Sequence, residues 1–534
     1  MVGYPSPSSW KGAAIRTASI HAVSLLCLIA ATLSAQAPVP AGERVGAPAT
    51  SARELVRLGS EALDREDAVE ALRSFRDAWH CDPADLQALV GVGRAQLQLG
   101  RATDALATAR EALGRDPQDE GALALSVRAL IRLRDFDGAL RASSQSVESG
   151  HAGASLMAAH GSALYRVQRN EEAAQAYRRV VELDPLSEEA HARLGSGLTA
   201  PCTFTPTARL RQAILAMREA RLDDALEELR AELAETPDQP VVHRLIGEVL
   251  FQQRASRSIV ETAACFATVR RLGQPAAIDP VLASDFVPAF AELGASRREV
   301  VTRTLATFEP YLAALISKGA RHDFLLEEER TTDDPARASL RGKRTFDGRV
   351  WDDVRGIGGL RAATGIEALD EAALCGFDTF AHEVAHQVHL HVLRDKPVFA
   401  RIRELYRHAI DGDRVLDYYA ASNWAEYFGQ GVEAFVSLAK RPEPEATHAH
   451  TRFELMRVDP ELHTLIAGLV AFDPLGPTSD RARRAELLRA AIDAALLMGR
   501  TDDAATATEL LDEPSERVAL RARIRGVAAM IDGH

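Results

Sequence analysis

The chain has few aromatic residues, few cysteines and no excess of positive charge. Phe, Trp and Tyr make up 5% of its 534 residues, and five residues are cysteine. Without a CxxC pair, thiolate metal sites and thioredoxin-type chemistry are not expected. The 63 basic residues are outnumbered by 76 acidic ones, for a net charge of −13, which argues against nucleic acid as the main partner. A single disulfide or separate buried thiols are both open for Cys81, Cys202, Cys265 and Cys375.

The residues that are abundant favour helices. Apolar residues account for 46% of the chain and charged residues for 26%, so most of the chain is expected to fold. Ala, Leu, Arg and Glu dominate, and these residues have high helix propensity. A chain of this length is too long for one ordinary core, so we expect two to four domains.

Residues 1–37 have the pattern of an export signal. Lys11 and Arg16 come before an apolar run, and small residues suited to cleavage lie near Ala35 and Ala37. The pattern predicts a secreted or periplasmic protein, and membrane attachment only if this segment is an uncleaved anchor. Residues 38–51, rich in Pro, Ala and Gly, are expected to form a linker.

A 34-residue period follows the linker. Asp-Pro pairs end at Pro83, Pro117 and Pro185, separated by 34 and 68 residues. Glycines lie 24 residues before each of these prolines and alanines lie 12 before, so that small residues let paired helices cross closely. This pattern resembles the tetratricopeptide repeat (TPR). We expect repeats over 52–255 with a break at 198–206, and a concave surface that binds a protein partner or serves only as a scaffold.

The segment FAHEVAHQVHLH, residues 380–391, contains an HExxH motif. His382 and His386 are one helical turn apart, so both imidazoles can reach one Zn²⁺, with Glu383 beside the open coordination position. His389 lies about 10 Å from His382 along the helix axis, which is too far for both to bind the same ion. The alternative is a helix with surface histidines. An amphipathic helix with one buried side is predicted by the apolar stripe of Phe377, Ala381, Val384 and Val388.

A third ligand has to come from another segment. The metzincin pattern fails, because it needs Gly at 389 and His at 392, where this chain has His389 and Val392. A helix expected over residues 418–440 offers Glu426 and Glu433, two turns apart on one face. Asp378, one turn before His382, could orient a ligand histidine, but we expect it at the surface.

HEVAH followed by YAASNWAEYFGQGVEAF resembles the catalytic domain of the anthrax toxin lethal factor type, which includes the Pro-Pro endopeptidases. The resemblance implies that Glu426 is the third zinc ligand and that Tyr419 helps to stabilise the tetrahedral intermediate. Tyr418 is an adjacent alternative for that role. The GQG of residues 429–431 departs from the family pattern, with Gln430 in place of an acidic residue.

The expected architecture is therefore mainly α. A TPR solenoid is followed by a linker or helix (256–284), an α+β zincin-like domain (285–475) and C-terminal helices (480–534) that cap this domain or continue the solenoid. The predicted function is that of an exported zinc metalloendopeptidase, in which Glu383 assists the attack of metal-bound water on a protein or peptide substrate. The alternative is a TPR protein-binding scaffold with an inactive peptidase-like domain.

Overall fold

The computed structural model describes residues 51–199, 204–275, 277–345, 347–441, 449–477 and 479–533. The predicted export signal (1–37) and all of the predicted linker except Ser51 lie outside these residues. Ser51–His534 form one compact unit. None of the described helices combines the length and the apolar character that crossing a membrane requires.

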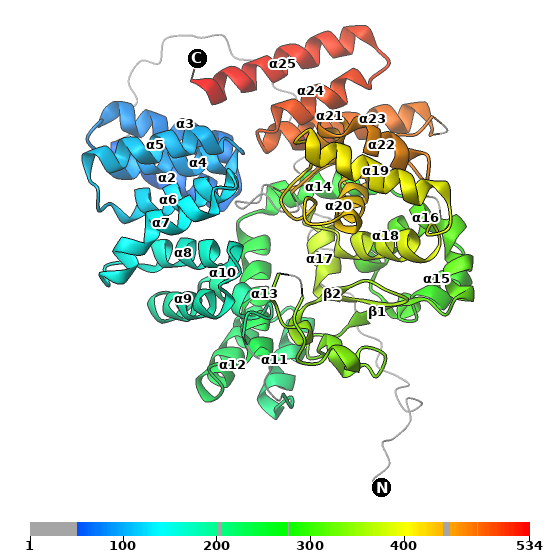
Figure 1. Cartoon of the computed structure of the whole chain (residues 1–534). Helices are drawn as coiled ribbons and strands as arrows, with labels where there is room; N and C mark the ends of the chain where they lie inside the picture. Colours follow the sequence, from blue (N-terminus) through cyan, green and yellow to red (C-terminus); the bar gives the residue numbers. More distant parts are fainter. Residues whose placement is uncertain are drawn as a thin grey trace. The chain divides into compact units, whose positions relative to one another are not determined.

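Consecutive helices of the first part stack as antiparallel pairs, drawn from blue to cyan in Figure 1. Small residues permit this packing, because a Cβ placed on Gly59 would lie 2.9 Å from the Phe75 ring. Tyr177 fills the corresponding place beside Gly161. The helices are α2 (Ala52–Asp64), α3 (Ala68–Cys81), α4 (Leu86–Gln98), α5 (Ala102–Arg115), α6 (Glu120–Arg132), α7 (Phe136–Glu148), α8 (Ala154–Arg166) and α9 (Asn170–Leu183).

The repeat pattern changes after α9. The short helix α10 (Glu188–Leu194) packs against α13 (Pro240–Arg257) and not against the next helix in the chain. The contact is close, since a Cβ on Gly195 would lie 2.6 Å from the Arg244 Cα. Between them, α11 (Ala208–Arg218) and α12 (Leu222–Glu235) form a further hairpin. The described residues of the predicted break at 198–206 contain no helix.

A small sheet comes next in the chain. It has the order β1-β3-β2, with β1 (Arg321–Leu325) parallel to β3 (Arg361–Gly365) and β2 (Gly356–Ile357) antiparallel to β3. Helices α15 (Pro280–Phe286) and α17 (Glu367–Ala373) contact the sheet, and α16 (Ala295–Ser317) packs on both of them. Helix α14 (Val260–Leu272) precedes this group in the chain. Short 3-10 turns are η2 (Phe290–Glu292), η3 (Thr331–Asp333), η4 (Ala338–Leu340) and η5 (Trp351–Asp353).

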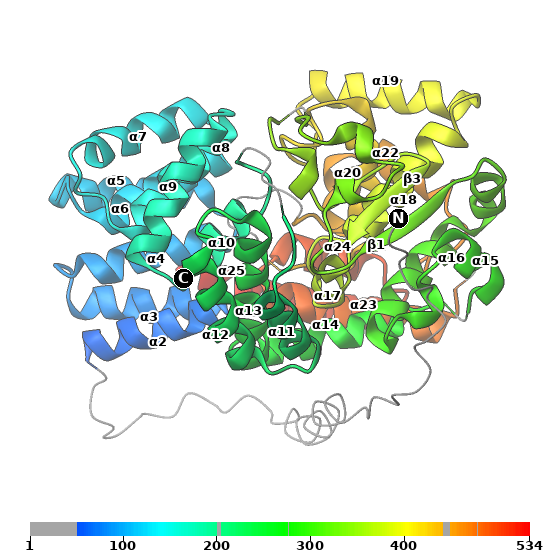
Figure 2. The same ribbon diagram turned by 90° about the horizontal axis from the view of Figure 1, so that it is seen from below.

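Two helices carry the residues of interest, α18 (Thr379–His391) and α20 (Trp424–Val436), with α19 (Pro397–Asp411) between them in the chain. Figure 2 shows α18 beside the sheet, and α18 and α20 pack against each other. Helix α18 is buried on all sides from Phe380 to His389. The expectation of an amphipathic helix with one buried side was therefore wrong, because the sheet, α16 and α20 enclose it.

The C-terminal helices are α21 (Arg452–Val458), α22 (Pro460–Ala467), α23 (Arg481–Leu497), α24 (Thr501–Glu509) and α25 (Pro514–Asp532). Helix α23 shares an apolar core with α14, which includes Phe266 and Leu487. Helix α25 reaches the first repeats, where Arg76 Nη1 donates to the Met530 carbonyl at 2.9 Å. The C-terminal helices were expected either to cap the catalytic domain or to continue the solenoid. They contact both the helices near the HExxH motif and the repeat array. A mainly helical chain, as predicted, contains a small three-stranded sheet.

Candidate metal centre

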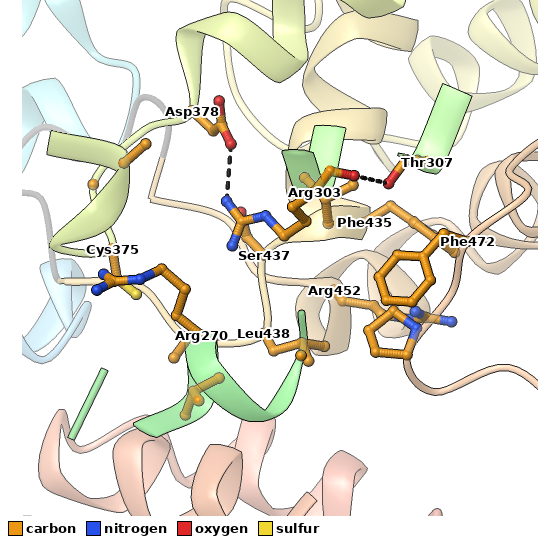
Figure 3. Close-up of a pocket in the computed structure, with 17 residues that line it drawn as sticks. Arg270, Arg303, Thr307, Cys375, Asp378, Phe435, Ser437, Leu438, Arg452 and Phe472 are labelled. Atoms are coloured by element: carbon orange, nitrogen blue, oxygen red, sulfur yellow. Dashed lines mark hydrogen bonds and ion pairs between the residues drawn. The ribbon is translucent and has the colours of Figure 1, made fainter. Parts of the chain in front are cut away.

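Helix α18 begins at a buried aspartate. The Asp378 carboxylate accepts a hydrogen bond from the Ala381 backbone N–H at 2.9 Å and so caps the helix. Its other oxygen accepts from Arg303 Nη2 at 2.9 Å, the contact drawn in Figure 3. The expectation of a surface position for Asp378 was wrong, because the cap and the ion pair need the carboxylate inside the fold.

The two histidines of the motif face each other one turn apart. Their Nε2 atoms are 2.9 Å apart, and both side chains are buried. The two Nδ1 atoms are also buried and have no hydrogen-bond partner among the described residues. Packing therefore orients these rings, and the Nε2 lone pairs are the ones presented to a shared ion.

Helix α20 supplies the third group. Asn423 caps it by accepting from the backbone N–H groups of Ala425 and Glu426, so the helix begins at Trp424. The expected helix over 418–440 is shorter than predicted, and Tyr418 and Tyr419 lie in the turn before it. Glu426 Oε2 is 3.1 Å from His382 Nε2 and 3.3 Å from His386 Nε2.

These three side chains form a group suited to a metal ion. Within the described part of the chain, the ligand atoms of His382, His386 and Glu426 all lie within 4.8 Å of one another. Two imidazoles and one carboxylate that leave a fourth position open are a donor set that Zn²⁺ takes in catalytic sites. The residues present therefore fit zinc.

Gly429 and Gly431, which depart from the lethal factor pattern, each lie at a close packing contact. A Cβ on Gly429 would lie 2.8 Å from His382 Cε1 and 3.0 Å from His386 Cε1. Gly429 thus allows α20 to approach both imidazoles closely enough for Glu426 to reach them. Gly431 serves a separate contact with Leu462, while Gln430 is buried.

The charges at the centre support one another. Burial opposes ionisation of Glu426, but hydrogen bonds from His382 and His386 outweigh it and hold the pKa of the Glu426 carboxyl well below its usual range. Burial also opposes the charged form of His382, yet its contact with Glu426 raises the pKa of that imidazole. Burial raises the pKa of Glu383, although the nearby imidazoles partly offset this effect. A carboxyl with a raised pKa is suited to receive and return a proton near neutral pH.

Glu383 opens into a cleft of about 280 Å³ that His382 and Tyr419 also line. The edge strand β2 runs beside the carboxylate, since Cβ atoms on Gly356 and Gly358 would lie 3.0 and 3.1 Å from its oxygens. The glycines bring the backbone of this edge close to Glu383. An extended peptide placed along β2 would therefore pass the Glu383 carboxylate.

The two adjacent tyrosines have different surroundings. The Tyr418 hydroxyl accepts a hydrogen bond from Arg166 of α8, whose guanidinium also lies 4.7 Å from the Tyr418 ring centre. Phe136 of α7 meets the same ring edge to face. The Tyr419 ring lies 6.4 Å from that of His382, and Tyr419 lines the cleft. Tyr419 is therefore the tyrosine beside the metal centre, whereas Tyr418 binds the repeat array.

Glu433 binds the backbone at the start of α18. Its Oε1 accepts from the Asp378 backbone N–H at 2.9 Å and from the Lys440 ammonium, and both side chains of this ion pair are buried. Glu433 thus lies at the start of α18, while Glu426 lies two turns away at the imidazoles. Of the two candidate carboxylates on α20, only Glu426 belongs to the group of three.

The two other histidines of residues 380–391 are not part of the centre. His389 is buried among the rings of Phe399, Trp424 and Phe428, and burial lowers its pKa to about 3. It therefore packs as a neutral ring. His391 is half-buried at the end of α18, and burial lowers its pKa as well.

The local sequence pattern did not predict the roles of three side chains near the centre. Arg349 lines the cleft, Lys440 neutralises Glu433, and the buried His450 forms an ion pair with Asp417. Asp417 also accepts from the Ala420 backbone N–H at 2.6 Å and so braces the turn that carries Tyr419. Lys440 lies seven residues from Glu433 and His450 lies 33 residues from Asp417. Periodicity within one helix or strand does not reveal such pairs.

Comparison with known proteins identifies the repeats. A family model described as tetratricopeptide repeat matches residues 54–120, 125–188 and 158–200, which confirms the TPR prediction for these residues. No curated protein matches the chain.

Three solved structures with similarity to this chain are as follows. The TPR protein TTC0263 of Thermus thermophilus is 22% identical and covers 38% of this chain and 100% of its own, with a TM-score of 0.26. MamA of Desulfovibrio magneticus is 21% identical over 35% and 97% of the two chains, with a TM-score of 0.23. A TPR protein of Parabacteroides merdae is 18% identical over 50% and 91%, with a TM-score of 0.24. Scores this low carry no argument about the present chain, so the repeat assignment depends on the family match.

Proposed function

We propose that this chain is a zinc metalloendopeptidase, exported by its N-terminal segment, whose TPR array binds a protein partner. The observation that carries the proposal is the convergence of His382, His386 and Glu426 beside a cleft lined by Glu383 and Tyr419. A structural helix with surface histidines would not bury both imidazoles against a carboxylate from another helix.

His382, His386 and Glu426 would hold the ion. Zinc, when bound, supplies a Lewis acid that polarises a carbonyl and makes water a better nucleophile near neutral pH. The Glu383 carboxylate takes the proton from the attacking water and passes it to the leaving amine. The Tyr419 hydroxyl donates a hydrogen bond to the oxygen on which negative charge develops.

Metal content tests the first half of this proposal. We expect about one zinc per chain in wild-type protein, measured by elemental mass spectrometry, and loss of this zinc in Glu426→Ala. Glu371→Ala is the matched control, because Glu371 lines the same cleft, is exposed and lies outside the ligand group. Wild-type protein that binds no zinc even when it is supplied would overturn the proposal.

Cleavage of a peptide library tests the second half. Wild-type protein should cut a subset of peptides, and Glu383→Gln should retain zinc while losing activity by about 100- to 10,000-fold. Equal behaviour of the two proteins would leave the alternative, in which the chain is a binding scaffold.

The scaffold alternative has support of its own. TPR repeats indicate a protein-binding scaffold, and the array has a groove of about 730 Å³ lined by residues of its first helices, including Arg94, Glu120 and Arg128. Pull-down of a partner by both wild type and Glu383→Gln would establish this binding role whether or not peptide bonds are cut.

A further inference from the structure

Arg349 lies in the same cleft as Glu383 and Tyr419. It belongs to a loop closed by an isolated bridge between Arg344 and Val350. Its side chain is 22% exposed, so it is largely enclosed but still reaches the cleft. A guanidinium in this place adds a positive charge beside the reacting groups.

One edge of this guanidinium is held by Asp347. Arg349 Nε donates to Asp347 Oδ2 at 2.7 Å, and the hydroxyl of Tyr165 donates to the same oxygen at 3.0 Å. The Asn170 amide donates to the Asp347 carbonyl at 3.1 Å. Tyr165 and Asn170 belong to α8 and α9, so the repeat array fixes the loop that carries Arg349.

The other edge of the guanidinium is free to bind a ligand. Among the described residues, neither Nη atom of Arg349 has a hydrogen-bond partner in the protein. Arg355, which lines the same cleft, differs. Its guanidinium pairs with Glu367 and donates to the carbonyls of Leu325, Leu326 and Glu329. Its charge and its donors are therefore used within the fold.

We infer that Arg349 binds a carboxylate of the substrate next to the scissile bond, so that the cleft selects peptides that carry a negative charge there. This inference depends on the proposed peptidase function. A guanidinium recognises a carboxylate through two parallel N–H donors, which gives geometric selectivity as well as attraction. The carboxylate comes either from an acidic side chain or from the free C-terminus of the peptide.

The experiment uses the full chain and the peptides that it cuts best in a library. Each peptide is made again with Glu or Asp replaced by Gln or Asn, one position at a time, and with the C-terminal acid replaced by an amide. We expect kcat/KM of the wild type to fall about 10- to 100-fold for one of these neutral replacements. Loss with a side-chain replacement identifies an acidic residue as the source, and loss with the amide identifies the C-terminus.

Arg349→Gln should cut the charged and the neutral peptide at nearly equal rates, with zinc content unchanged. Arg349→Lys, which keeps the charge but lacks the planar pair of donors, should retain part of the discrimination. The matched control is Arg344→Gln, which removes an exposed arginine from the same loop and should discriminate as the wild type does.

Two results would overturn the inference while leaving the proposed function intact. One is a wild type that cuts charged and neutral peptides equally well. The other is an Arg349→Gln protein that binds zinc and loses kcat equally for every peptide, which would make Arg349 a positioning residue. If zinc-loaded wild type cut no peptide at all, the proposed function would fail, and the inference with it.

Discussion

Gly429 lies directly against His382, so that a Cβ at position 429 would be only 2.8 Å from the Cε1 atom of the imidazole. Glycine in a helix interior costs about 1 kcal/mol relative to alanine. Its presence in α20 is explained by the close approach of this helix to α18. The distance from Glu426 to both imidazoles depends on that approach.

Gly429→Ala should weaken zinc binding about 10- to 100-fold, a range typical of changes to groups that orient metal ligands. The added methyl displaces both imidazoles, while the helix itself gains propensity. Zinc titration with a competing chelator measures the effect. Gly431→Ala is the control, because its Cβ would meet Leu462 at 2.5 Å and not a histidine. It should cost about 1–3 kcal/mol of stability and leave zinc affinity unchanged, and equal zinc loss in both variants would contradict this explanation.

Tyr419→Phe should lower kcat about 100-fold with zinc content unchanged, because a hydrogen-bond donor to the developing oxyanion is lost. Tyr418→Phe should change kcat only a few-fold, since its hydroxyl binds Arg166 of the repeat array. Steady-state kinetics on one cleaved peptide compares the two. A larger loss of kcat in Tyr418→Phe than in Tyr419→Phe would show that Tyr418, and not Tyr419, has the catalytic role.

Lys440→Met should lower the free energy of unfolding by about 3–5 kcal/mol, because it leaves the buried Glu433 carboxylate without its partner. Chemical denaturation measures this change. Combining Lys440→Met with Glu433→Gln should restore part of the loss, as expected for two residues that interact directly. Additive effects of the two substitutions would show that the pair is not coupled.

The ion pair of His450 predicts a pH dependence of stability. Burial opposes its charged form, but the carboxylates of Glu454 and Asp417 outweigh burial and raise the His450 pKa from 6.5 to about 10. A group with a raised pKa in the folded state stabilises the fold fully below pH 6.5, and this contribution is lost as the pH rises towards 10. The stability difference between wild type and His450→Gln should therefore shrink across that interval.

Thermal unfolding between pH 6 and 10 measures this difference. His151→Gln, a change at an exposed histidine of the repeat array, should leave the pH profile of the wild type unchanged. A difference between wild type and His450→Gln that stays constant up to pH 10 would show that His450 is not held in its charged form.

Local patterns predicted the elements that depend on neighbouring residues. The Pro, Gly and Ala positions of the 34-residue period indicated the repeats, since each repeat buries small residues at fixed places such as Gly59 against Phe75. The prediction for α20 began too early, because Asn423 competes for the first backbone N–H groups and starts the helix there. Asp378 was misplaced because one turn of sequence does not reveal Arg303, 75 residues earlier.

By itself, the amino-acid sequence determined the helical repeats and the placement of His382 and His386 one turn apart, because both follow from helical geometry over a few residues. Only the tertiary structure decided which carboxylate of α20 meets the imidazoles, which tyrosine lines the cleft and which arginine stands beside it. Those outcomes depend on contacts between distant segments, such as Tyr165 with Asp347 and Arg166 with Tyr418. The energy of such contacts depends on how whole helices pack, which no local spacing encodes.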